Sequence, residues 1–228
     1  MNVKRQLPIL CSLIVAVAIA CSAQDANLEK VLDSMDRMSQ SFRSVQADFV
    51  WDQFTKVVNE TDKQSGAIYF RRAGKDEIEM AADVKAPAPK YVLFNKGTVK
   101  LYEPSIDRVT EYNVNKNADF QSFLVLGFGG SGHGMLKNFD VKYGGAENVM
   151  GVNAAKLILT PKQQKVQNMF SQIILWIDPA RGISVQQQFL SPDGDYRLAK
   201  YNNIVPDKNI PDSVFKIKTT GKTQVVKP

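Results

Sequence analysis

The spacing of apolar residues changes abruptly near position 44, and this change constrains the fold more than any other feature. From Leu28 to Phe42, apolar residues recur every three or four positions, which predicts an amphipathic helix. From Val45 to Trp51 they alternate with polar residues, which predicts a strand with one buried face. The chain therefore passes from a helix into a sheet.

Further short apolar or alternating segments follow, separated by turn residues. Asn95-Lys96-Gly97 predicts a tight hairpin turn, and residues 178–182 and 191–195 combine Asp, Pro and Gly in further turns. With Val214–Lys218 as the last predicted strand, we expect about ten or eleven strands. Strands joined by short turns pair with their neighbours, so the predicted fold class is α+β, a single domain with a large antiparallel sheet.

A single sheet of this size tends to curl, and helices packed inside the curl would complete its core. We expect a second helix over residues 117–126. The glycine-rich segment 127–134 that follows predicts a flexible hinge. It lacks the lysine of a phosphate-binding loop, and it follows a helix rather than a strand.

The N-terminus has the pattern of a secretory signal peptide. Lys4 and Arg5 supply a basic start, residues 7–20 are almost all apolar, and small residues follow. The apolar run of about 14 residues is shorter than the roughly 20 that a membrane-spanning helix needs. We therefore expect residues 1–23 to be a signal peptide cleaved near 20–23, and residues 24–228 to form one exported domain.

The end of this segment leaves two outcomes open. Ala18-Ile19-Ala20 and Cys21-Ser22-Ala23 both fit a small-x-small cleavage site, which would release a free protein. Ala18-Ile19-Ala20-Cys21 also resembles the lipobox of bacterial lipoproteins, although the first of these positions is usually Leu. Lipidation of Cys21 would anchor the protein, and the Ser that follows would direct it to the outer membrane.

Composition argues against most catalytic and nucleic-acid functions. The net charge of +6 is spread along the chain, and no nucleic-acid recognition motif is present. Cys11 and Cys21 both lie in or beside the signal, so the exported domain would hold no disulfide. His133 is the one histidine, which excludes a zinc site of the usual kind, and no nucleophile elbow accompanies nearby Ser131. We expect no enzyme activity, no metal and no cofactor.

Several segments, taken in their order and spacing, resemble the outer-membrane lipoprotein carrier family and its wider superfamily (LolA-like; LolA/LolB). The similarity extends from about residue 28 to residue 226. The segments are Phe42-x-x-Val45-x-Ala47-x-Phe49, Gly66–Arg72, Asn95-Lys96-Gly97, Leu101–Pro104, Leu157–Lys162, Ile177-Asp178, Asp193-Gly194, Tyr201–Ile204 and Phe215.

The resemblance implies an incomplete, strongly curved antiparallel β-barrel whose helices form a lid over an apolar cavity. It implies a monomeric periplasmic carrier that binds the acyl chains of lipoproteins or other lipids. An inner-membrane lipoprotein-releasing transporter would supply the cargo, and an outer-membrane acceptor would receive it. The alternative is an outer-membrane-anchored lipoprotein, lipidated at Cys21, that acts as a lipoprotein acceptor or lipid-binding protein on the same fold.

The resemblance also implies roles for individual residues. In the family, an Arg at the end of the Gly-initiated strand holds the lid, and Arg72 occupies that position; the family's next residue, Pro, is Ala73 here. Met35 and Met38 would contact the lid. Alternation leaves open which set of side chains faces inward, because a register shift of one residue exchanges the faces. The residues expected to line the cavity are Phe49, Trp51, Ile68, Phe70, Met80, Leu93 and Tyr102.

Overall fold

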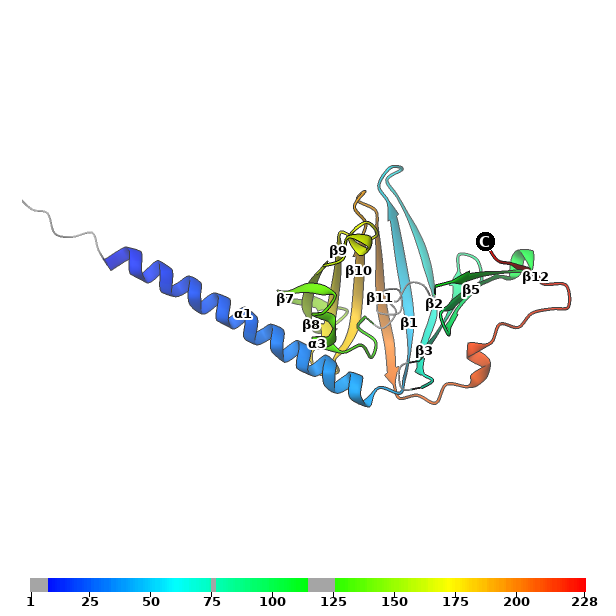
Figure 1. Cartoon of the computed structure of the whole chain (residues 1–228), viewed down its shortest axis with the longest axis horizontal. Coiled ribbons are helices and arrows are strands. Elements are labelled where there is room, and N and C mark those ends of the chain that lie inside the picture. Colours follow the sequence, from blue (N-terminus) through cyan, green and yellow to red (C-terminus); the bar gives the residue numbers. More distant parts are fainter. Residues whose placement is uncertain (1–7, 75–76, 115–125) are drawn as a thin grey trace, which may run out of the picture.

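The computed structural model describes residues 8–74, 77–114 and 126–228, with the backbone alone for residues 8–23 (Figure 1). In chain order the elements are α1 (Pro8–Ser41), β1 (Ser44–Thr55), β2 (Glu60–Arg72), β3 (Ile78–Ala86), β4 (Lys90–Asn95), β5 (Thr98–Glu103), η1 (Pro104–Ile106), β6 (Arg108–Asn113), α3 (Gly132–Met135), β7 (Phe139–Val149), β8 (Val152–Pro161), α4 (Gln164–Gln167), β9 (Gln172–Asp178), β10 (Ile183–Leu190), β11 (Tyr196–Pro206), η2 (Asp212–Phe215) and β12 (Gln224–Val226).

One curved sheet contains every described strand. Its 12 strands follow the order β12-β6-β5-β4-β3-β2-β1-β11-β10-β9-β8-β7, so the sheet does not close on itself in the described part of the chain. All pairs are antiparallel except the parallel pair of β12 with β6. The predicted fold class, a strongly curved antiparallel sheet, is confirmed, with slightly more strands than expected.

Tight turns set the register of the hairpins. Lys96 and Gly97 join β4 to β5 with φ values of 47° and 69°, and Met150 and Gly151 join β7 to β8 with φ values of 49° and 83°. Two consecutive positive φ angles belong to the turn whose twist matches that of paired strands. The predicted hairpin turn at residues 95–97 is therefore present.

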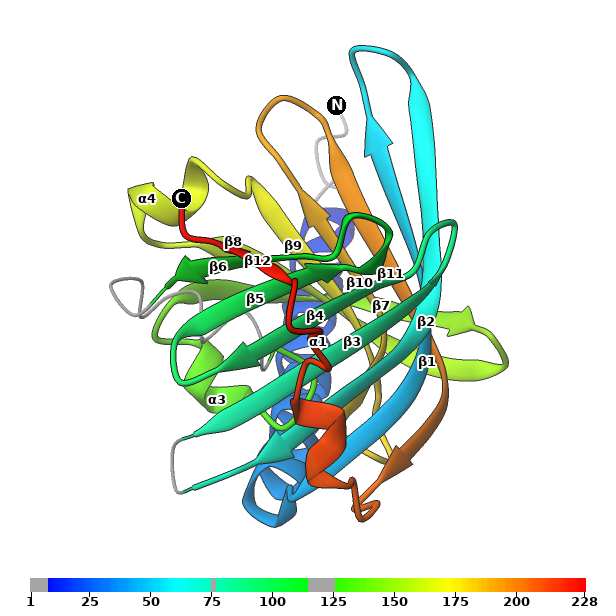
Figure 2. The ribbon, with the colours of Figure 1, turned by 90° about the vertical axis from the view of Figure 1, so that its right-hand side faces the viewer.

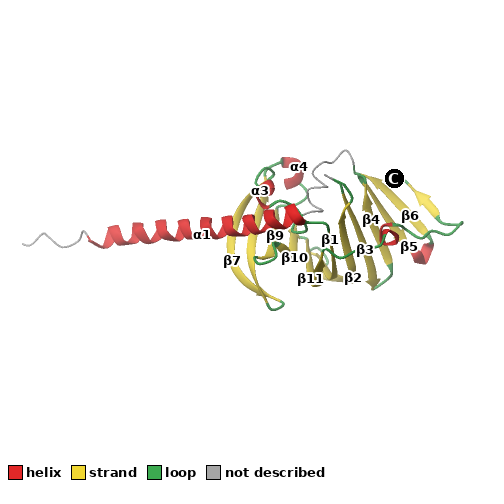
Figure 3. Cartoon of the chain, turned by 90° about the horizontal axis from the view of Figure 1, so that it is seen from below, coloured by secondary structure: helices red, strands yellow, loops and turns green. Residues whose placement is uncertain are grey.

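The sheet has two differently covered faces. The inner face carries the C-terminal half of α1 and the segment Leu126–Met135 (Figure 3). The outer face carries the C-terminal segment, defined here as residues 207–226, which crosses β3, β4 and β5 (Figure 2). Because strand side chains alternate between faces, each strand contributes one set to each.

α1 is longer than the sequence analysis predicted. It extends from Pro8 to Ser41, and its first half projects beyond the sheet (Figure 1). In its second half, Val31, Leu32 and Met35 are buried against β7, β8 and β9. The expected cleavage region 20–23 thus lies within this helix, and the helix predicted over 117–126 lies, except for Leu126, outside the described residues. None of the described helices combines the length and hydropathy of a membrane span.

The C-terminal segment corrects one predicted strand. Residues 214–218 form no strand; η2 begins at Asp212, and Phe215 is buried beside Leu93 on the outer face. The apolar side chains that suggested a strand instead fill a gap between this segment and the sheet. The three exposed residues of β12 pair with the edge strand β6, and the sequence analysis did not anticipate this strand.

Candidate functional site

An aromatic-rich apolar cluster covers the centre of the inner face. It brings together four residues of the predicted cavity lining, Phe49, Ile68, Phe70 and Met80, all of them buried. Trp51 lies at its edge and stacks on Phe49, with ring centroids 4.1 Å apart. β1, β2 and β3 supply these residues at alternate positions, as the two-residue period predicted.

Leu93 and Tyr102 lie on the opposite face. Leu93 packs with Ala81 and Phe215 beneath the C-terminal segment. Tyr102 pairs with Tyr91 across β4 and β5 on the same side. The residues of these two strands that face inward include Val92 and Phe94 of β4 and Val99 of β5. The sequence analysis assigned Leu93 and Tyr102 to the wrong face of the sheet, because β4 and β5 carry apolar side chains on both faces.

Met35 and Met38, which were predicted to contact the lid, lie against different parts of the inner face. Met35 is fully buried with the residues of β7 to β9, and Met38 packs half-buried against the aromatic cluster. Methionine is flexible and polarisable, so it adapts to neighbours of varied shape. α1 therefore bridges the two halves of the inner face with side chains suited to repacking.

Arg72 ties the end of α1 to β2. Its Nε donates a hydrogen bond to the carbonyl of Phe42 at 3.2 Å, and its Nη2 donates to the carbonyl of Ser39 at 3.3 Å. The guanidinium also lies 5.9 Å from the centroid of the Phe42 ring. A cation at a helix C-terminus satisfies carbonyls that have no partner within the helix and complements the helix dipole. This geometry suits the predicted lid latch.

A second polar contact, between His133 and α1, was missed by the sequence analysis. His133 Nδ1 lies 2.5 Å from Asp36 Oδ2, and Nε2 lies 3.0 Å from Glu29 Oε2. Ser131 donates to Asp36 Oδ1 at 2.7 Å. Both ring nitrogens face carboxylate oxygens, so the doubly protonated imidazolium satisfies this arrangement. The seven-residue spacing of Glu29 and Asp36, which places them on one helix face, was the available signal. We refer to these four residues as the histidine clamp.

Two glycines let the backbone of α1 approach closely. A Cβ at Gly132 would lie 2.4 Å from the carbonyl oxygen of Leu32, and a Cβ at Gly182 would lie 2.3 Å from that of Ser34. Gly132 therefore packs the glycine-rich segment closely against α1, at a place where the sequence analysis predicted a flexible hinge. Leu126, which precedes this segment, is fixed by Gln187, whose Nε2 donates to the Leu126 carbonyl at 2.6 Å.

The pKa values of the histidine clamp depend on its ion pairs. Hydrogen bonds to Glu29 and then to Asp36 raise the pKa of His133 above its ordinary value. Burial acts to raise the pKa of Asp36, but its hydrogen bonds from Ser131 and His133 together outweigh this and lower it. The ion pairs of the histidine clamp are therefore formed at pH values above the acid range in which Asp36 takes up a proton and below the raised pKa of His133.

We expect docking of α1 to weaken as pH rises through the His133 pKa. A raised pKa in the folded state stabilises the docked helix fully below the ordinary histidine value, and this contribution disappears as His133 loses its proton. Because the pairs are partly exposed, the loss should be about 1 kcal/mol. Hydrogen exchange of the α1 amides between pH 6 and pH 9 measures it. His133→Gln should abolish the pH-dependent part, whereas an unchanged profile in that variant would contradict the histidine clamp.

Two further predictions concern lipidation and metal binding. The Cys21 side chain, the predicted lipidation site, lies outside the described part of the structure. Within the described residues, no group of three His, Cys, Asp or Glu side chains could hold a metal ion.

Comparison with known proteins identifies the family. Residues 40–218, well over half of the chain, match the family described as outer membrane lipoprotein carrier protein LolA. No curated protein sequence is similar enough to count as a match.

Solved structures share the fold at low sequence identity. An uncharacterized conserved protein from Thermus thermophilus is 13% identical with a TM-score of 0.56, covering 88% of this chain and 98% of that one. The Pseudomonas aeruginosa MucA/MucB complex contains a chain 15% identical with a TM-score of 0.51, covering 84% of this chain and 61% of that one. Because the matched residues span the end of α1 and strands β1 to β11, the chain belongs to the LolA family of outer membrane lipoprotein carrier proteins.

Proposed function

We propose that this protein is a periplasmic carrier that binds the acyl chains of lipoproteins on the inner face of its sheet and moves them from the inner to the outer membrane. Membership of the LolA family supports this proposal. The observation that carries it is the attachment of α1. The second half of the helix packs on the apolar residues of β7 to β9, its end reaches the aromatic-rich cluster at Met38, and its polar contacts with Arg72 and His133 can be broken and remade.

The energies of lid and cargo are comparable, which a carrier requires. Val31, Leu32 and Met35 of α1 are buried against the sheet, and each contributes roughly 2 kcal/mol by leaving water. Each buried methylene of an acyl chain contributes about 0.8 kcal/mol, so roughly eight methylenes balance these three side chains. Cargo can therefore displace the lid, and the lid can in turn help to expel cargo.

We assign the acyl-chain contacts to five residues of the inner face, Phe49, Trp51, Ile68, Phe70 and Met80. Met35 and Met38 would exchange contacts with the sheet for contacts with cargo. Leu93 and Tyr102 are not included, because the outer face holds them. Arg72 would serve as the latch of the closed, cargo-free state.

The donor would be an inner-membrane lipoprotein-releasing transporter, and the recipient an outer-membrane acceptor. Residues 1–23 would direct export and then be removed, leaving a free monomer in the periplasm. Mass spectrometry of the mature N-terminus separates this carrier from the anchored alternative. An acyl-modified Cys21 would overturn the free-carrier form and leave an outer-membrane lipid-binding protein.

Binding of acyl chains is tested with a synthetic triacylated lipopeptide and the same peptide without its acyl chains. A fluorescent fatty-acid probe bound to the purified protein should be displaced by the acylated form alone. Equal displacement by both forms, or no binding of the probe, would remove the basis of the proposal.

A further inference from the structure

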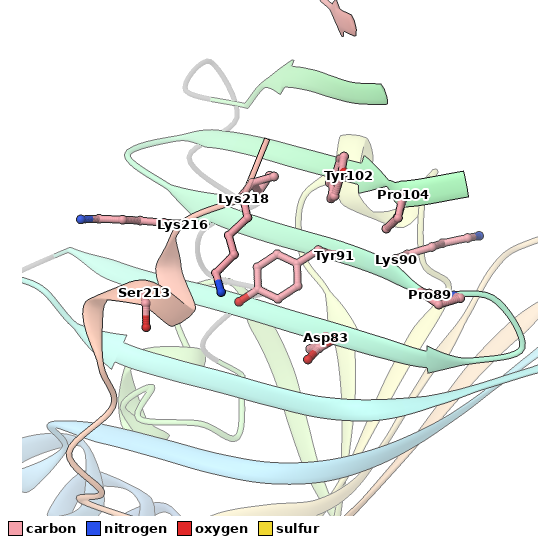
Figure 4. Close-up of a pocket in the computed structure, with 10 residues that line it drawn as sticks. Asp83, Pro89, Lys90, Tyr91, Tyr102, Pro104, Ser213, Lys216 and Lys218 are labelled. Atoms are coloured by element: carbon pink, nitrogen blue, oxygen red, sulfur yellow. The ribbon is translucent and has the colours of Figure 1, made fainter. Parts of the chain in front are cut away.

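A pocket of about 210 Å³ lies on the outer face, between the C-terminal segment and strands β3 to β5 (Figure 4). The opposite face of the sheet carries the proposed lipid site, so the two are separated by the sheet itself. The pocket is lined by Asp83, Pro89, Lys90, Tyr91, Tyr102, Pro104, Ser213, Lys216, Ile217 and Lys218. Its volume is that of roughly seven water molecules, which is enough for one bulky side chain.

Three residues, Arg71, Tyr91 and Asp107, hold the C-terminal segment in place as a wall of this pocket. Arg71 binds Asp212 at 2.5 Å and lies 4.3 Å from the centroid of the Phe215 ring. The Tyr91 hydroxyl donates a hydrogen bond to the carbonyl of Val214. Asp107 accepts hydrogen bonds from Thr220 and Thr223, both at 2.7 Å, further along the segment. The pocket is thus formed before any ligand arrives, which reduces the entropy cost of binding.

The centre of the pocket is apolar and aromatic. Tyr91 supplies its ring, and Pro89, Pro104 and Ile217 add aliphatic surface. Burial, with the nearby charge of Asp83, raises the pKa of Tyr91 to about 12, so its hydroxyl stays protonated and keeps its bond to the wall.

The rim of the pocket is basic. Lys90, Lys216 and Lys218 line it, and none of the three forms a salt bridge within the described residues. The nearby acids have cationic partners of their own: Asp83 pairs with Lys85 at 2.6 Å, and Asp212 pairs with Arg71. Arg71 and, less strongly, Lys216 lower the pKa of Asp212, and three lysines beside these two paired acids leave the rim with an excess of positive charge.

The directions of these lysines indicate what kind of anion they suit. Lys216 and Lys90 extend away from the centre on opposite sides, while Lys218 lies over Tyr91 (Figure 4). In this arrangement the three amines do not converge on one point, as they would around a small anion such as phosphate. They match several negative charges distributed along an extended chain, with an apolar group at the middle.

We propose that this pocket docks an acidic peptide segment of a partner protein, which inserts one bulky apolar side chain into the apolar centre lined by Tyr91, Pro104 and Ile217. The carboxylates that flank this side chain pair with Lys90, Lys216 and Lys218. Small pockets that anchor one large side chain are a common centre of protein interfaces. The surrounding charges favour encounter with acidic partners over others.

The test measures fluorescence anisotropy of a short labelled peptide in which one Trp is flanked by Asp and Glu residues. Two peptides serve for comparison: one with Asn and Gln in place of the acids, and one with Ser in place of Trp. The acidic Trp peptide should bind most tightly, and high salt should weaken it, because salt shortens the Debye length from about 10 Å at 0.1 M to about 3 Å at 1 M.

The double variant Lys216→Gln/Lys218→Gln should weaken binding about four-fold, since each exposed ion pair contributes roughly two-fold. Lys137→Gln/Lys142→Gln removes the same charge from exposed positions at the other end of the sheet and should leave affinity unchanged. Equal loss in both variants, no preference for the acidic peptide, or binding to anionic vesicles without binding to the peptide would each overturn the proposal. Acyl-chain binding is measured in a separate experiment, so a negative result with these peptides would not count against the proposed lipid site.

Discussion

Arg72→Leu should allow cargo uptake but slow cargo release about thirty-fold. The substitution removes the two hydrogen bonds from the guanidinium to the carbonyls of Phe42 and Ser39. Bonds of this charged kind contribute about 2 kcal/mol to the closed state, and that energy corresponds to roughly thirty-fold in an equilibrium. Because the substitution makes the closed, cargo-free state less stable, α1 competes less strongly with cargo for the inner face. Cargo therefore stays bound for longer.

The measurement follows transfer of a fluorescent acylated lipopeptide from the protein to acceptor vesicles. Arg37→Leu is the matched control, because Arg37 is an exposed cation on α1, the helix whose end Arg72 contacts. It removes the same charge without touching the latch, and its release rate should stay at that of the unmodified protein. Release by Arg72→Leu at the unmodified rate would show that the closed state does not depend on this residue.

Phe128→Ala should have the largest effect on stability, a loss of about 4 kcal/mol in the free energy of unfolding. Phe128 is 1% exposed and lies in the glycine-rich segment that supports α1. Its ring stacks on Phe70 at 4.9 Å and meets the edge of Tyr201 at 4.7 Å. Truncation therefore leaves a cavity at the point where this segment joins the aromatic cluster.

Urea denaturation of the purified protein measures this loss as a lower midpoint. Tyr112→Ala provides the comparison, because Tyr112 is 44% exposed on β6 and its truncation should cost about 0.5 kcal/mol or less. If Phe128→Ala shifts the midpoint no more than Tyr112→Ala does, the glycine-rich segment is not part of the cooperative core. The inner face would then be assembled without it.

Short-range pattern predicted most elements, because each pattern reports a local property of the backbone. The two-residue period from Val45 to Trp51 marked a strand with one buried face, and Asn95-Lys96-Gly97 marked a turn that needs positive φ angles. The stripe beginning at Leu28 marked the helix that covers the sheet. The family resemblance, carried by segments along the whole chain, is likewise confirmed.

The errors arose where a side chain's environment depends on a distant segment. Leu93 and Tyr102 were assigned to the inner face because β4 and β5 are apolar on both sides. Residues 214–218 were assigned to a strand because their apolar character could not reveal that Phe215 fills the outer face. Neither the alternation nor the composition of these segments indicates which distant segment will pack against them.

By itself, then, the sequence determined where the chain is helical or extended, where it turns, and that apolar side chains cover one face of a long antiparallel sheet. Tertiary structure alone decided which face each apolar residue of β4 and β5 occupies. It also joined His133 to Glu29 and Asp36, some hundred residues apart, and set the C-terminal segment beside Tyr91. The reason is physical: backbone preferences act over a few residues, whereas burial and charge pairing depend on which distant surfaces the folded sheet brings into contact.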